Sequence, residues 1–286
     1  MQQVELRPLS LGEILDRTFS LYRRNFLLFL GISAIPQLLI LAVNLVQVLA
    51  LPTGRRTPSA LVGGMSGGSL VALGIVGAIV GIFVYVVAYL FAQGGTIYAV
   101  SDVYLGRTTT IGASLRKMRG QLLNLLGVSI LNSVAVLIAT IFLIIPGIYM
   151  ACRLITCVPA ALLEDLGARE SLERSFALTK GSAWPAFVIY FLFLSMLYAT
   201  MLLFTIPFMV MVAFAARQPG LLHWAMGLMQ VGNFCATVLV TPFFLIATSV
   251  FYYDMRVRKE AFDLQLMMGA GGGTPAASAG VPSLLT

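Results

Sequence analysis

The residues of this sequence that could do chemistry are the ionisable side chains inside or beside its long apolar stretches. Arg153 is the one charge well inside such a stretch, and an ionisable residue within a bilayer is a candidate site because placing it there is costly. It follows Gly147 by six residues, about 9 Å of helix, so its long side chain could reach the outer membrane interface. Three roles are open: reaching that interface, binding a structural partner, or contacting a ligand or lipid headgroup.

Cysteine and histidine are too few or too dispersed for a catalytic or metal site. Cys152, Cys157 and Cys235 all lie in apolar stretches, where we interpret them as small buried hydrophobic residues. The single histidine, His223, excludes a histidine-rich metal or proton-relay site. No HExxH motif, nucleophile–histidine pairing or paired intramembrane aspartate occurs. We therefore expect no catalytic residue, no metal and no cofactor, and a protein that is not an enzyme.

Acidic residues follow the second, fourth and sixth apolar stretches, each close to a basic residue. We expect them to form ion pairs within the chain, and a metal site is the alternative that lacks histidine support. The acidic residues are Asp102, Glu164, Asp165 and Asp254, and the nearby basic residues are Arg107, Arg169 and Arg256.

Six long apolar stretches must position these side chains. Hydrophobic residues make up 59% of the 286 positions and charged residues 10%, whereas an ordinary soluble domain is about 25% charged. A stretch of about 18 or more apolar residues predicts a transmembrane helix. The stretches are Phe26 to Leu51, Leu70 to Ala92, Leu122 to Ile145, Ile148 to Leu163, Pro185 to Ala215 and Ala225 to Tyr252.

The fourth stretch decides the topology. It has sixteen residues after the expected turn at Pro146–Gly147, or roughly 24 Å of helix, so it crosses thinly or is partly re-entrant. With six spans, fourteen Lys and Arg residues lie on one side and Arg55, Arg56 and Arg217 on the other. Because basic loops stay inside, this asymmetry places both termini in the cytoplasm. The basic residues lie between the apolar stretches, which points to anionic lipids and not to nucleic acid.

A short amphipathic segment precedes the first, third and fifth stretches, beginning at Leu11, Ile111 and Ala168. In the first copy, Ser10 and Glu13 predict a capping box that starts a helix. Aligning the copies brings three basic residues to one position, Arg17, Lys117 and Arg174. The expected fold is therefore an all-α integral membrane protein of about six spans in three hairpins, each preceded by a cytoplasmic interfacial helix, as a parallel pseudo-repeat. The alternative is that any cytoplasmic segment before a span tends to be amphipathic and basic.

Domain boundaries follow from the same pattern. We expect a cytoplasmic segment with an interfacial helix over residues 1–25, a six-span domain over 26–253, a cytoplasmic helical segment over 254–268 and a disordered Gly/Ala/Pro tail over 269–286. Gly74, Gly77 and Gly81 in the second span are spaced for close helix packing or self-association.

Four motifs together carry a resemblance: LRPLSLGEILDRTFSLYRRNF from Leu6, PGIYMACR from Pro146, SLERSFALTKGS from Ser171 and YYDMRVRKEAFDLQL from Tyr252. The chain resembles uncharacterised bacterial membrane proteins related to the membrane domain of glycerophosphoryl diester phosphodiesterases, over about Leu6 to Met268. In those phosphodiesterases a separate soluble barrel with acidic and histidine residues is catalytic. The resemblance implies a membrane module without that barrel, and it does not transfer the hydrolase activity.

Two functions remain open. The first is a non-enzymatic module of the bacterial inner membrane that organises anionic lipids or a partner protein, alone or as a homo-oligomer, with Arg17, Lys117, Arg174 and Arg153 as candidate contacts. The second is a small transporter or channel with a path between the repeats.

Overall fold

The computed structural model describes residues 8–50, 67–215 and 219–260, and every regular element in these ranges is an α-helix. The helices are α1 (Leu11–Arg24), α2 (Phe26–Ala50), α4 (Gly67–Tyr104), α5 (Ile111–Met118), α6 (Leu122–Phe142), α7 (Ile144–Arg153), α8 (Cys157–Leu163), α9 (Ala168–Leu178), α10 (Ala183–Ala215) and α11 (Pro219–Glu260). The expected all-α class is confirmed. The expected tail over 269–286 lies outside the described residues, as do Arg55, Arg56 and Arg217, the basic residues expected on the opposite side.

Six candidate membrane spans are long and apolar enough to cross a bilayer, as the sequence predicts. The fourth is interrupted, because α7 ends at Arg153 and α8 begins at Cys157. The predicted turn at Pro146–Gly147 is wrong: the chain reverses at Leu143, which is extended (φ −164°, ψ 150°). Pro146 and Gly147 belong to the first turns of α7, where a proline is tolerated since its missing N–H would have no helical partner.

Several helices extend beyond their apolar stretches. α4 continues twelve residues past the predicted end at Ala92, and its 38 residues make about 57 Å of helix. α11 runs without a break through the predicted boundary between residues 253 and 254 and reaches Glu260. These extensions carry the polar ends of the two helices beyond the apolar core, about 30 Å thick, that a bilayer offers.

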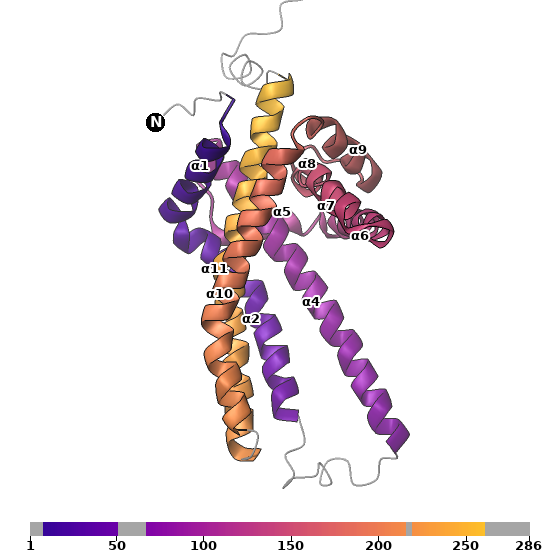
Figure 1. Cartoon of the computed structure of the whole chain (residues 1–286), viewed down its shortest axis with the longest axis vertical. Helices are drawn as coiled ribbons and strands as arrows, with labels where there is room; N and C mark the ends of the chain where they lie inside the picture. The colour runs from indigo at the N-terminus through magenta and orange to yellow at the C-terminus, as the bar shows by residue number, and fades with distance from the viewer. Residues whose placement is uncertain (1–7, 51–66, 216–218, 261–286) are drawn as a thin grey trace, which may run out of the picture.

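The helices form a long bundle with a broader head (Figure 1). α10 and α11 run side by side along the length of the molecule, and α2 and α4 lie beside α11. α6 and α7 pair with each other beside the head, and Figure 1 shows them foreshortened, at a steep angle to α10. α1, α5, α9 and the C-terminal end of α11 gather in the head. The described N- and C-terminal ends therefore lie at the same end of the molecule.

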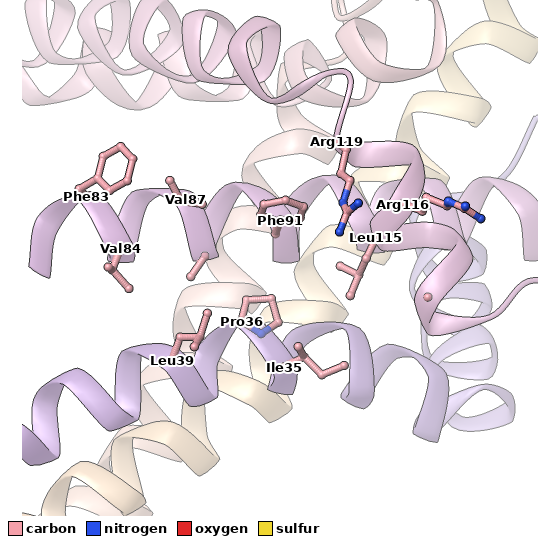
Figure 2. A pocket seen from close by; sticks show the side chains of 12 residues that line it. Ile35, Pro36, Leu39, Phe83, Val84, Val87, Phe91, Leu115, Arg116 and Arg119 are labelled. Carbon is pink, nitrogen blue, oxygen red and sulfur yellow. The ribbon is translucent and has the colours of Figure 1, made fainter. Parts of the chain in front are cut away.

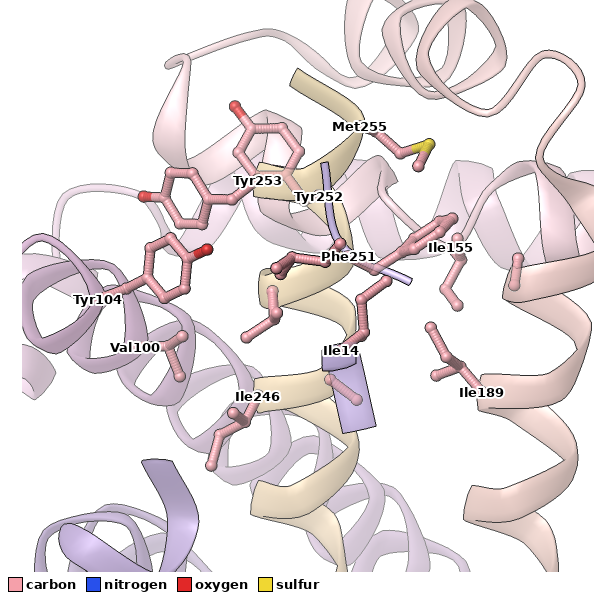
Figure 3. Packing of buried hydrophobic residues seen from close by; sticks show 14 of the residues in the cluster. Ile14, Val100, Tyr104, Ile155, Ile189, Ile246, Phe251, Tyr252, Tyr253 and Met255 are labelled. Atoms are coloured by element: carbon pink, nitrogen blue, oxygen red, sulfur yellow. The ribbon is translucent and has the colours of Figure 1, made fainter. Parts of the chain in front are cut away.

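The buried core lies in the head, where α1, α4, α10 and α11 meet (Figure 3). Ile14, Ile189 and Phe251 come from three different helices and are almost fully buried there. α2 and α10 below the head, and α6 beside it, expose large apolar side chains, as is expected of helices that face lipid. The start of α1 is the one that the sequence predicts: Ser10 Oγ accepts from Glu13 N (3.3 Å) and Glu13 Oε2 from Ser10 N (2.7 Å).

The tip of the α6–α7 hairpin is entirely apolar. Leu143 alone joins the two helices, and the five residues around it expose between 62% and 78% of their surface. They are Ile141, Phe142, Leu143, Ile144 and Ile145. A surface of this kind is suited to hydrocarbon and not to water.

Close helix packing depends on glycines other than those the sequence suggested. Gly77 has open space around it, Gly81 faces Gln47 of α2 at 3.4 Å from an added Cβ, and the surroundings of Gly74 lie outside the described residues. At Gly147, by contrast, an added Cβ would lie 2.1 Å from Thr140 Oγ1 and 2.8 Å from Thr140 Cα. Gly147 therefore lets α7 approach the backbone of α6.

We expect Gly147→Ala to lower the free energy of unfolding by about 1–3 kcal/mol, because the methyl group would overpack a site bounded by backbone. The melting temperature of the protein in mild detergent measures this loss. Gly77→Ala is the matched control and should leave the melting temperature unchanged or raised, since alanine favours a helix over glycine. Equal melting temperatures for the two variants would contradict the close approach of α6 and α7.

Candidate functional site

Each of the three short helices α1, α5 and α9 packs against a helix that belongs to a different hairpin from the one it precedes. α1 lies on α11, α5 on α4, and α9 on α8 and α6. Between α5 and α4, Lys117 Nζ donates to Asp102 Oδ2 at 2.6 Å, and the Asp102 side chain is 9% exposed. The expected ion pair of Asp102 is confirmed, with Lys117 as its partner in place of Arg107.

Between α9, α8 and α11 lies a larger group, the Glu164 cluster, formed by Tyr252, Glu164, Arg174, Arg256 and Glu260. Arg174 holds Glu164 with two hydrogen bonds, from Nε to Oε2 (2.7 Å) and from Nη2 to Oε1 (2.9 Å). Arg174 also pairs with Glu260 through Nη1, and Arg256 Nε lies 3.1 Å from Glu260 Oε2. The Tyr252 hydroxyl donates to Glu164 Oε1 at 2.7 Å.

The Glu164 cluster is balanced in charge and largely withdrawn from solvent. Its two guanidinium groups face two carboxylates, and the four side chains are 17% to 25% exposed. The hydrogen bond from Arg174 to Glu260 raises the pKa of Arg174 further above its ordinary value, so this arginine stays charged at every physiological pH. Paired in this way, the cluster joins three helices and offers no free charge to a ligand.

A second polar contact ties the two ends of the described chain together. Asp254 of α11 is 2% exposed. Its carboxylate accepts hydrogen bonds from the backbone N–H of Leu9 (2.7 Å) and from Arg258 Nε (2.8 Å). Arg258 Nη2 donates to the Leu9 carbonyl. The segment before α1 is thus fixed to α11 through main-chain hydrogen bonds as well as packing.

Arg17 contacts the aromatic ring and hydroxyl of Tyr104, and it pairs with no carboxylate of the described residues. Its Nη1 donates to the Tyr104 hydroxyl at 3.0 Å, and its guanidinium lies 5.4 Å from the Tyr104 ring centre. Tyr104 stacks on Tyr253 (4.9 Å between centroids), whose hydroxyl lies 2.7 Å from Ser101 Oγ. This stack connects α1, α4 and α11, and cation–aromatic contacts of this kind stabilise by about 0.5–2 kcal/mol.

Arg153 has structural partners in α9. Its Nη2 donates to the Phe176 carbonyl at 2.7 Å, and its guanidinium lies 5.4 Å from the Phe176 ring centre. The Arg153 carbonyl accepts from Ser175 Oγ (2.9 Å) and Thr179 Oγ1 (2.8 Å), which satisfies backbone freed by the end of α7. Of the roles left open for Arg153, the structure shows the structural partner, since its guanidinium is directed to Phe176 of α9.

The aligned residues Arg17, Lys117 and Arg174 therefore all bind protein groups, and the structure does not bring them together at one site. Many basic side chains, Lys117 among them, are exposed at the surface. Among the described residues, ten exposed side chains are basic and four are acidic. The basic ones are Arg23, Arg24, Arg107, Arg116, Lys117, Arg119, Arg169, Lys180, Arg258 and Lys259, and the acidic ones are Asp16, Asp165, Glu170 and Glu173.

A groove of about 600 Å³ lies between α2, α4 and α5, below this basic surface (Figure 2). Its two long walls are apolar, with Ile35 and Leu39 from α2 and Phe83 and Phe91 from α4. At the end nearest α5 lie Leu115, Arg116 and Arg119. Figure 2 shows the Arg119 guanidinium between Phe91 and Leu115, and the Arg116 guanidinium directed away from these residues.

Sequence reasoning missed this groove, although its signal was present. It selected Lys117 from the second amphipathic segment, whereas Lys117 is paired with Asp102 and its neighbours Arg116 and Arg119 line the groove. Their spacing of three residues places them on one face of the segment. Within the described ranges, no group of three His, Cys, Asp or Glu side chains could hold a metal ion.

Polar residues of the spans partly form the interhelical contacts that amides are expected to make. Asn124 Nδ2 donates to the Leu166 carbonyl (2.9 Å), and Asn233 Oδ1 accepts from Thr205 Oγ1 (3.0 Å). Asn44 and Gln47 of α2 instead line two small cavities of about 290 and 270 Å³, on the α4 and α11 sides of α2. Asn44 and Gln47 thus give the bundle two small cavities with polar side chains in their lining, in addition to the groove.

The fold defines an all-helical protein with six candidate spans. No protein-family model, no curated protein and no solved structure matches the chain. The resemblance to the membrane domain of glycerophosphoryl diester phosphodiesterases stays a prediction.

Proposed function

We propose that this chain is a non-enzymatic, multi-pass protein of the bacterial inner membrane that organises anionic lipids of the cytoplasmic leaflet. One observation carries the proposal: exposed basic side chains outnumber exposed acidic ones by ten to four, on short helices and helix ends gathered at one end of the bundle. Three of the ten, Lys117, Arg169 and Arg258, pair with carboxylates. Each basic residue near an anionic surface contributes about 1 kcal/mol of attraction. Such a surface concentrates anionic headgroups around the head.

The proposed topology places both termini and the head in the cytoplasm. The positive-inside rule and the Leu9–Asp254 contact between the two ends of the described chain support this orientation. A reporter that fluoresces only in the cytoplasm, fused after Thr286, should be bright, and the same reporter inserted near Arg55 should be dark. The opposite pattern would reverse the orientation.

The proposed architecture is a set of three parallel repeats, each an interfacial helix followed by a hairpin. Its support is the recurrent packing of α1 on α11, of α5 on α4 and of α9 on α8. α5 and α9 each contact the second helix of the hairpin that precedes them in the chain. α1 contacts α11, the second helix of the last hairpin, so the same contact closes the set of three. The steep angle of α6 and α7 makes the second repeat the most divergent.

The lipid preference can be measured directly. Protein reconstituted in a phosphatidylcholine bilayer with a minor fraction of phosphatidylglycerol should retain phosphatidylglycerol above its bulk proportion when extracted gently. The enrichment should fall in high salt, which screens exposed charges over about 3 Å at 1 M. It should also fall in the triple variant Arg23→Gln, Arg24→Gln and Arg107→Gln. Retention at the bulk proportion by the unmodified protein would contradict the proposal.

A transporter is the second candidate, favoured by the cavities on both sides of Asn44 and Gln47. Polar residues that line cavities between spans are a feature of transport paths. Flux of small metabolites into proteoliposomes, abolished by Gln47→Leu, would favour this function. A broad panel without flux would remove it.

A further inference from the structure

The groove between α2, α4 and α5 has the form of a site for one amphiphile. Its volume of about 600 Å³ lies within the range of about 300–1,000 Å³ that ligand sites occupy. Along the α4 wall, Phe91 follows Phe83 by eight positions, or about 12 Å of helix. Figure 2 places Phe83 at one end and Arg119 at the other. The groove thus has a long apolar part and one cationic end.

The cationic end is suited to a phosphate. Arg116 and Arg119 are exposed, and Lys117 between them is already neutralised by Asp102. No carboxylate lines the groove among the described residues. Guanidinium groups bind phosphate through paired charge-assisted hydrogen bonds, and they bind it more specifically than an ammonium does. Arg119 therefore presents a charge at the end of the apolar channel, with the exposed Arg116 beside it and no carboxylate in the lining.

We propose that the groove holds an acyl chain of an anionic glycerophospholipid, with its headgroup bound by Arg119 and Arg116. The inference rests on the proposed lipid-organising function and assigns it one specific site. Charge complementarity selects this occupant: a free phosphate would leave the apolar walls of Ile35, Leu39 and Phe91 unfilled, and an apolar helix from a second copy would leave both arginines unpaired.

The chain supplies matched variants for a test. Gly112 lines the groove with open space around it, and Gly12 occupies the aligned position of α1, also with open space. Gly112→Phe fills the groove, whereas Gly12→Phe places the same ring on a surface away from it. Likewise Arg116→Gln with Arg119→Gln removes two charges at the groove, and Arg23→Gln with Arg24→Gln removes two charges elsewhere in the head.

The experiment is native mass spectrometry of the full chain in mild detergent, titrated with phosphatidylglycerol. One tightly retained phosphatidylglycerol is expected, and each groove variant should weaken it by about tenfold or more, the scale of losing hydrogen bonds to a charged group. The two controls should retain it. A phosphatidylglycerol with a photoreactive group in its chain should crosslink to peptides around Phe83 and Val87 in the unmodified protein and not in Gly112→Phe.

The outcomes separate the two proposals. The groove variants could retain phosphatidylglycerol as the unmodified protein does, while the triple variant of Arg23, Arg24 and Arg107 still loses bulk enrichment. This result would overturn the proposed groove site and leave the proposed function standing. No phosphatidylglycerol preference in any variant overturns both. Displacement of the lipid by inorganic phosphate or glycerol phosphate at equal concentration would identify a free-phosphate site. A change from dimer to monomer in Gly112→Phe would identify a second copy as the occupant.

Discussion

Glu164→Ala is expected to lower the free energy of unfolding by about 2–4 kcal/mol. Breaking a fully buried ion pair costs about 3–5 kcal/mol, and the cost is smaller here because the Glu164 side chain is 17% exposed. The substitution removes both hydrogen bonds of Arg174 to the carboxylate and the acceptor of the Tyr252 hydroxyl. It leaves two arginines facing Glu260 alone. The contact of α9 with α8 and α11 loses its main polar support.

The melting temperature in mild detergent tests this expectation. In a protein of 150–250 residues, each kcal/mol lost from the free energy of unfolding lowers the melting temperature by about 2–4 °C. Glu173→Ala is the matched control. It breaks an ion pair on the same helix, Arg169–Glu173, whose side chains are 89% and 68% exposed, and exposed pairs of this kind contribute at most about 1 kcal/mol. Equal effects of the two substitutions would show that the Glu164 cluster does not join the helices.

The second large effect is expected at Asp254. Asp254→Ala leaves the buried Leu9 N–H without its acceptor and removes the carboxylate that holds Arg258. Losing the partner of a buried donor costs about 1–3 kcal/mol, and the loss of a charged partner adds to it. The segment before α1 should therefore separate from α11, while the spans remain assembled.

Hydrogen exchange by mass spectrometry resolves this local change, since it reports the opening of single segments. Amides of residues 9–14 should exchange much faster in Asp254→Ala than in the unmodified protein, with little change in α10. Asp254→Asn keeps an oxygen acceptor for Leu9 and should give an intermediate rate. Asp16→Ala removes an exposed carboxylate from α1 itself and should leave exchange unchanged. Uniformly faster exchange in all helices would contradict a local contact.

Features that depend on neighbouring residues were predictable. The six candidate spans follow from local runs of apolar residues, and the start of α1 follows from Ser10 and Glu13, which lie three residues apart. Ion pairing of the acidic residues was expected from the basic residues near them, and it is confirmed for Asp102, Glu164 and Asp254. Among the described residues, Asp165 instead accepts a hydrogen bond from Gln121. These predictions needed no knowledge of how the helices pack.

Features that depend on distant residues were not predictable. Glu164 pairs with Arg256 and Tyr252, about ninety positions along the chain, and no periodicity links these residues. The outer interface was one of three roles left open for Arg153, because its depth was counted along one continuous helix. In the structure α7 ends at this residue, and its side chain is directed to α9. The groove is formed by three separate helices and becomes visible only when α2, α4 and α5 are placed side by side.

The apolar tip of α6 and α7 has a consequence for membranes of different thickness. Residues 141–145 carry no polar side chain, so the tip presents no hydrogen-bonding side chain to lipid headgroups. Near the base of the hairpin, Gln121 Nε2 donates to Asp165 (2.6 Å) and Asn124 to the Leu166 carbonyl (2.9 Å). Hydrophobic mismatch usually costs fractions of a kcal/mol per ångström. If the hairpin lies in the bilayer as proposed, covering its tip with additional hydrocarbon would desolvate no charged side chain, so bilayers of different thickness should be tolerated on this side.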